Sequence, residues 1–100
     1  MPTDLTVPQT IASQIGGKAF YMMGTRQGEL IGSERNLSFR IRGSQRVTHV
    51  SITLNPLDLY DIEFLYCRNH QRKVVEKAED IYFDSLHDCI QRVTGLYLSL

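Results

Sequence analysis

The chain has 100 residues, and its 11 basic and 11 acidic side chains give a formal net charge of zero at pH 7. This length fits one domain, over residues 1–100, with a self-supporting core. The neutral balance argues against a protein that binds nucleic acid through charge alone.

The first third of the sequence predicts a helix followed by two short strands. Residues 6–9 have the spacing of a helix start with a capping box, and the pair Gly16 and Gly17 is a typical helix stop. The composition of residues 19–23 and 29–33 then predicts two strands.

The middle of the sequence carries the most regular pattern, because apolar and polar residues alternate from residue 36 to residue 67. This alternation is typical of an antiparallel sheet with one buried and one solvated face. Strands are predicted at residues 37–42, 47–54 and 60–67, with a further one at 72–77. The apolar positions expected to share the buried face are Leu37, Phe39, Ile41, Val50, Ile52, Leu54, Ile62, Phe64 and Tyr66.

The last part of the sequence predicts a second helix, which begins at Glu79 or Asp80 and ends at Gly95. The apolar tail at residues 96–100 is expected to dock on the fold. The prediction is therefore an α+β domain, in which one N-terminal and one C-terminal helix pack on one face of an antiparallel meander of five or six strands. The residues expected to form the buried stripe of the second helix are Tyr82, Leu86, Cys89, Ile90 and Val93.

Catalytic, metal and cofactor sites are not predicted. Asp84 and His87 are three residues apart and could meet on one helix face, but a solvated helix face is the simpler interpretation. We therefore expect a non-enzymatic protein without a metal or a cofactor. Metal-ligand spacings do not occur among the cysteines and histidines, which are His49, Cys67, His70, His87 and Cys89.

The solvated face of the predicted sheet is the surface available for binding another molecule. Arginines often anchor protein interfaces, and a surface with charges of both signs suits a selective protein partner. The alternative is a small nucleic-acid-binding module, although the aromatic residues that could stack on bases fall on the buried side of the alternation. The residues predicted to contact a protein partner are Arg40, Arg42, Arg46, His49, Asp61 and Glu63. The residues that would contact phosphates in the alternative are Arg40, Arg42, Arg68, Arg72 and Lys73.

Three short stretches resemble a family of small proteins, of similar length, that phages, prophages and other mobile elements carry. They are Ile-Thr-Leu-Asn-Pro and Leu-Tyr-Asp-Ile-Glu-Phe within residues 52–64, and Thr-Gly-Leu-Tyr at residues 94–97. The resemblance implies a setting, a bacterial host cell, but no catalytic residues. By association, the partner would be a host or phage protein, for example a defence complex such as a CRISPR effector.

The compartment predicted from the sequence is the cytoplasm. Residues 1–8 are polar and lack the apolar core of a signal peptide, and the chain has no apolar run long enough to span a membrane. Two cysteines are too few for a disulfide framework, so both thiols are expected to be free. Nothing in the sequence indicates an oligomeric state.

Overall fold

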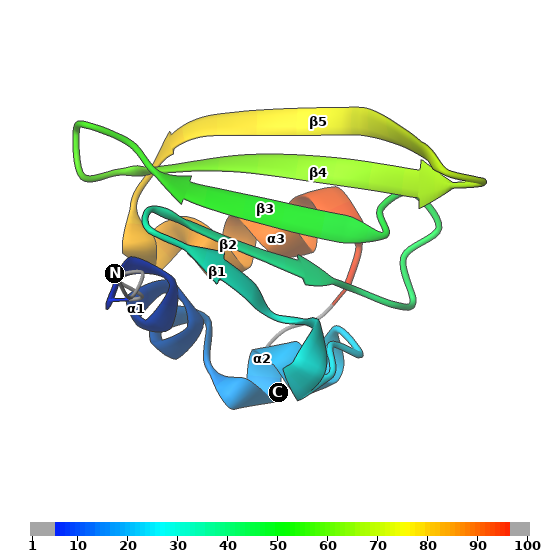
Figure 1. The fold of residues 1–100 in the computed structure, drawn as a ribbon, viewed down its shortest axis with the longest axis horizontal. Helices are drawn as coiled ribbons and strands as arrows, with labels where there is room; N and C mark the ends of the chain where they lie inside the picture. Colours follow the sequence, from blue (N-terminus) through cyan, green and yellow to red (C-terminus); the bar gives the residue numbers. More distant parts are fainter. Residues whose placement is uncertain (1–5, 97–100) are drawn as a thin grey trace.

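The protein has an α+β fold, in which a five-stranded antiparallel sheet packs against helices from the N-terminal and C-terminal regions (Figure 1). The computed structural model describes residues 6–96, except for the side chain of Gln27. The helices are α1 (Thr6–Ile15), α2 (Gly17–Met22) and α3 (Leu86–Thr94), with two short 3-10 helices, η1 (Gln27–Glu29) and η2 (Phe83–Ser85). The strands are β1 (Ile31–Ser33), β2 (Asn36–Arg40), β3 (His49–Leu54), β4 (Tyr60–Arg68) and β5 (Gln71–Ile81).

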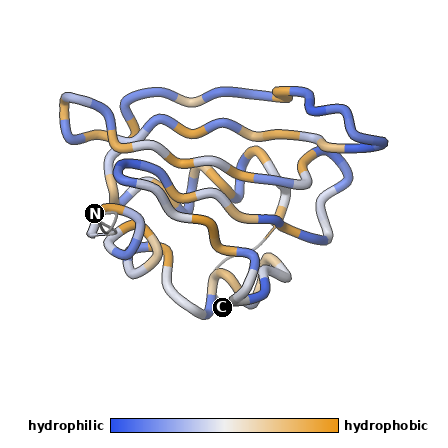
Figure 2. Tube along the Cα trace, viewed as in Figure 1, coloured by the Kyte–Doolittle hydropathy of each residue, from blue (hydrophilic) through white to orange (hydrophobic). Residues whose placement is uncertain are grey.

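The strands form a meander in the order β1-β2-β3-β4-β5, and each neighbouring pair is antiparallel. The register places Val50 opposite both Phe39 and Phe64. The apolar residues of the three central strands therefore share one face, as the alternation predicts. Figure 2 shows this alternation along the central strands, whereas β5 is mainly hydrophilic. The predicted α+β class and antiparallel meander are confirmed.

Helices from both ends of the chain cover this apolar face. Ile15 of α1 and Ile90 of α3 belong to the same buried cluster as Phe39 and Phe64 of the sheet. His87 Nε2 lies 2.6 Å from the carbonyl oxygen of Ile15, so His87 joins α3 to α1, and the solvated position expected for it is wrong. In Figure 1, α3 lies behind the sheet and α1 and α2 lie below it, so no described helix crosses the front of the central strands.

The strand predicted at residues 19–23 is wrong, because these residues belong mainly to helix α2. Ala19 and Phe20 are buried, while Tyr21 is 81 % exposed, which is the pattern of a helix with one apolar side. Gly16 separates α1 from α2 with a φ of 88°, a conformation that glycine adopts at little cost. The glycine pair therefore marks a sharp turn between two helices. The strand predicted at residues 29–33 is shorter, since η1 precedes it.

The second predicted helix begins later in the structure, because β5 continues through Glu79 and Asp80. This edge strand is exposed over most of its length, and two register irregularities against β4 interrupt its period. Its sequence therefore does not alternate, and its acidic end, Glu79 and Asp80, resembles the start of a helix although it belongs to β5. Tyr82, predicted in the buried stripe, is 63 % exposed. Gly95 ends α3 in the left-handed conformation, as predicted.

The structure does not describe the residues at the two ends of the chain. Leu96 packs against the core cluster, in line with a docking tail, but residues 97–100 of that tail lie outside the described residues, as do residues 1–5 of the polar start. Cys67 and Cys89 are both free thiols, as predicted. Burial raises the pKa of the Cys89 thiol, which keeps it protonated at neutral pH.

Candidate functional site

The face of the sheet opposite the helices is the first candidate surface, and we call it the open face. It is built by period-two alternation, so every second residue of the central strands points to it. Its side chains are half-buried or exposed, except for Leu65, which is buried between His49 and Val74 in the register. The open face consists of Ile31, Ser33, Asn36, Ser38, Arg40, His49, Ser51, Thr53, Asp61, Glu63, Leu65, Cys67, Arg72, Val74 and Lys77.

A network of small polar side chains forms the centre of the open face. The Asn36 amide nitrogen donates hydrogen bonds to Ser51 Oγ at 2.9 Å and to Thr53 Oγ1 at 2.8 Å. The Ser38 hydroxyl donates to Asn36 Oδ1 at 2.9 Å. These bonds span β2 and β3 and fix the side chains in place, so the centre of the face presents a short-chained, pre-ordered polar surface.

His49 lies at the basic end of the open face. It is opposite Arg40 in the register, and its Nδ1 lies 2.8 Å from the hydroxyl of Thr48. Partial burial lowers the pKa of His49 below 6.5, and the positive charges of Arg40 and Arg72 lower it further. His49 is therefore neutral at pH 7. Asp61 and Glu63 lie further along the strands, opposite Thr53 and Ser51, and Leu65 is the residue of β4 opposite His49.

The acidic end of the open face is formed by Asp61 and Glu63. Asp61 Oδ1 accepts hydrogen bonds from the Asn55 side-chain amide and from the backbone N–H of Asp80, both at 3.1 Å. It thereby holds the β3–β4 turn next to the irregular end of β5. Glu63 faces Ser51 on one side and Lys77 on the other. The open face thus changes from basic to acidic along the strands.

Arg42 and Arg46, predicted as partner contacts, do not lie on the open face, because β2 ends at Arg40. Arg42 makes a bidentate salt bridge with Glu29, with Nη1–Oε1 at 2.6 Å and Nη2–Oε2 at 2.8 Å, and it donates to the Gly24 carbonyl at 2.7 Å. This salt bridge lowers the pKa of Glu29 to about 2. Arg42 therefore ties two loops together, and Arg46 is exposed in the loop at 41–48.

The residues of the nucleic-acid alternative are divided between two faces. Arg72 is opposite Cys67 and shares the open face with Arg40, whereas Lys73 is opposite Tyr66, on the other side of the sheet. Arg68 is exposed at the end of β4. Among the described residues, no aromatic ring belongs to the open face. The structure therefore brings together Arg40 and Arg72 of this set, without a stacking platform.

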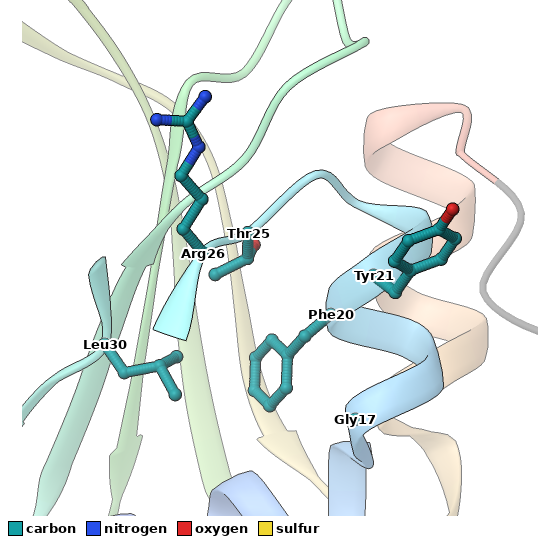
Figure 3. Close-up of a pocket in the computed structure, with 6 residues that line it drawn as sticks. All are labelled: Gly17, Phe20, Tyr21, Thr25, Arg26 and Leu30. Atoms are coloured by element: carbon teal, nitrogen blue, oxygen red, sulfur yellow. The ribbon is translucent and has the colours of Figure 1, made fainter. Parts of the chain in front are cut away.

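Sequence reasoning missed a hollow beside the first strand. It measures about 350 Å³, lies between α2 and the start of β1, and is mostly apolar (Figure 3). The sequence does not predict this hollow, because α2 forms one side of it and residues 19–23 were predicted as a strand. Residues 19–23 are apolar or aromatic throughout, so no spacing within this stretch could have revealed the hollow. The lining residues are Gly17, Phe20, Tyr21, Thr25, Arg26 and Leu30.

Comparison of the chain with protein-family models, with curated proteins and with solved structures found no match. Within residues 6–96, no group of three or more His, Cys, Asp or Glu side chains could hold a metal ion. No helix in the same range is long and apolar enough to cross a membrane.

Proposed function

We propose that this protein is a non-enzymatic binding module and that its open face contacts a protein partner. The observation that carries the proposal is the arrangement of this face, where a pre-ordered polar centre on β2 and β3 lies beside the acidic Asp61 and Glu63 of β4 and is followed along the strands by a basic end at Arg40. A surface with both signs of charge complements one particular charge pattern and repels others, which favours a selective protein contact over a phosphate backbone.

Nucleic-acid binding is the second candidate, and one observation favours it. The guanidinium groups of Arg40, Arg68 and Arg72 make no hydrogen bond or ion pair with any described residue, so their charges are free for an anion. Phosphate contacts of this kind weaken steeply as the salt concentration rises. The divided faces and the absence of a described aromatic platform on the open face make it the weaker candidate.

The resemblance to proteins of phages and mobile elements suggests where to look for the partner. Small proteins of such elements often act by occupying host machinery, so host defence complexes, including CRISPR effectors, are the first candidates to test. The choice of partner follows from this association, whereas the proposed contact surface follows from the geometry of the open face.

The test is capture of a partner from a bacterial lysate on the immobilised chain, with and without nuclease, followed by titration of the captured protein. Arg40→Glu and Glu63→Lys reverse the charge of a basic and of an acidic residue of the open face, and Lys18→Glu, at an exposed position of α2, is the matched control. We expect one nuclease-resistant protein, whose affinity falls at least tenfold with either open-face variant and stays unchanged with the control. Capture of nucleic acid alone, or equal binding by all variants, would overturn the proposal.

A further inference from the structure

A second surface runs along the free edge of β1, on the side of the sheet away from β5. Its first part is the hollow of about 350 Å³, where the side chains of Phe20 and Leu30 point toward one another (Figure 3). This volume is at the lower end for ligand sites, so it suits one large apolar side chain better than a cofactor. Phe20 is itself held by an edge-to-face contact with Phe39, with ring centroids 5.1 Å apart.

A second hollow extends this apolar surface toward α1. It measures about 170 Å³, and Leu30 lines it as well as the first hollow, so the two are adjacent. We call the combined surface the β1 groove. The residues that line its second part are Pro8, Gln9, Ala12, Leu30, Gly32 and Leu37.

The backbone beside the β1 groove is open to a further strand. Ser33 and Asn36 flank a two-residue turn, and Gly32 is the next residue along, opposite Leu37. Because alternate pairs of an antiparallel ladder point their N–H and C=O groups outward, those of Gly32 face the free edge. Within the described chain, only β2 pairs with β1. Ile31 beside it is 68 % exposed.

The other edge of the sheet is protected against such pairing. β5 carries charged side chains along most of its length and two register irregularities. Charged residues and bulges are the means by which native edge strands avoid pairing with another chain. β1 has neither, since it consists of Ile, Gly and Ser. Of the two edges of the sheet, the edge at β1 is therefore the one that can pair more readily with an added strand.

The charge at the mouth of the groove selects the occupant. Arg26 stands at one end of the hollow, and its guanidinium makes no hydrogen bond or ion pair with a described residue. The nearby Glu29 does not neutralise it, because both carboxylate oxygens of Glu29 are held by Arg42. The mouth is therefore positive and complements a carboxylate.

We propose that the β1 groove binds an extended peptide segment of a partner protein by strand addition to β1. The segment places a large apolar side chain between Phe20 and Leu30, a carboxylate on Arg26, and its backbone along Gly32. Backbone pairing supplies affinity in this mode of recognition, and the pocket and the charge supply specificity. The inference does not depend on the open face, because the two surfaces share no residue.

The experiment is an NMR titration of the ¹⁵N-labelled full chain with two blocked pentapeptides, acetyl-Asp-Phe-Val-Phe-Asp-amide and the matched acetyl-Lys-Phe-Val-Phe-Lys-amide. We expect shifts at Thr25, Leu30 and Gly32, with a Kd at least tenfold lower for the acidic peptide. The same acidic peptide with an N-methyl group on its valine is expected to bind at least tenfold more weakly, because it loses a pairing N–H.

Three variants complete the test. Arg26→Glu is expected to reverse the order of affinity, so that the basic peptide binds more tightly than the acidic one. Lys18→Glu makes the same charge change on a residue that does not line the hollow, and it is expected to preserve the order of affinity. Gly17→Leu is expected to weaken binding of the acidic peptide at least fivefold by filling the hollow. A Cβ at Gly17 meets no atom of another part of the chain within 4 Å, so we expect the variant to fold, and its ¹⁵N spectrum without peptide checks this. Absence of shifts with both peptides, shifts confined to the open face, or an unchanged order in Arg26→Glu would overturn the proposal.

Discussion

The two faces of the sheet differ in what their residues do for the fold. On the helix-covered face, Phe39, Ile62 and Phe64 are almost wholly buried within one apolar cluster. On the open face, the same strands present Asn36, Ser51 and other polar groups whose hydrogen bonds are made locally. Burial of apolar surface is the dominant stabilising term in folding. The comparison teaches that stability depends on one face, which leaves the chemistry of the other free for binding.

Neighbouring residues of β4 give the strongest test of this comparison. Phe64→Ala removes a fully buried ring, and we expect it to lower the free energy of unfolding by about 3–5 kcal/mol. Glu63→Ala, one residue away on the open face, should change it by no more than about 0.5 kcal/mol. Urea denaturation of both variants measures the difference. Similar losses for the two would show that the open face is part of the stabilising core.

The polar network of the open face should contribute less than the core but more than an isolated surface group. Asn36→Ala removes the amide that bridges β2 and β3, and we expect a loss of about 1–2 kcal/mol in the free energy of unfolding. Ser38→Ala, the control, removes hydroxyl bonds at the edge of the network and should cost less. A loss at Asn36 as large as that at Phe64 would contradict the division between the faces.

The sequence predicted those parts of the fold in which one side of an element is buried and the other side is exposed to solvent. Phe39, Val50 and Phe64 show this alternation, and β2 to β4 follow from it. β5 lacks it, because an edge strand with bulges is solvated on both sides. Five apolar and small residues in a row at 19–23 fit a strand or a helix equally well, and only tertiary contacts decide between them.

The candidate site was predictable to the same extent as the strands that carry it. Arg40, His49, Asp61 and Glu63 lie on the open face because the parity of their strands was correct. Arg42 does not, because the salt bridge with Glu29 depends on a loop that lies thirteen residues earlier in the sequence. The β1 groove was not predictable, since it forms between elements of which one had been assigned incorrectly.

The salt bridge beside the β1 groove gives a prediction about pH. The pKa of Glu29 falls from 4.5 to about 2 on folding, so its contribution to stability is present above pH 4.5 and is lost as the pH falls toward 2. Glu29→Gln should therefore be less stable than the wild type at pH 6, and the gap should narrow between pH 4.5 and pH 2. Thermal unfolding across this range measures it. A gap that does not change with pH would exclude the ionised pair as its cause.

The smallest expected effect concerns His49, at the basic end of the open face. Its pKa is lowered by burial and by Arg40 and Arg72, so the folded protein binds its proton less readily than the unfolded chain, and stability falls as the pH drops through the range below 6.5. Arg40→Gln removes one of the two charges, which should raise the pKa of His49 and reduce this acid sensitivity. Arg46→Gln, an exposed arginine of the loop at 41–48, is the matched control and should leave the pKa in place. The pKa is measured by NMR titration of the imidazole protons. If both variants raised the pKa of His49 equally, the shift would come from the net charge of the protein and not from the position of Arg40 opposite His49. The register of β2 and β3 would then not set the charge of this part of the open face.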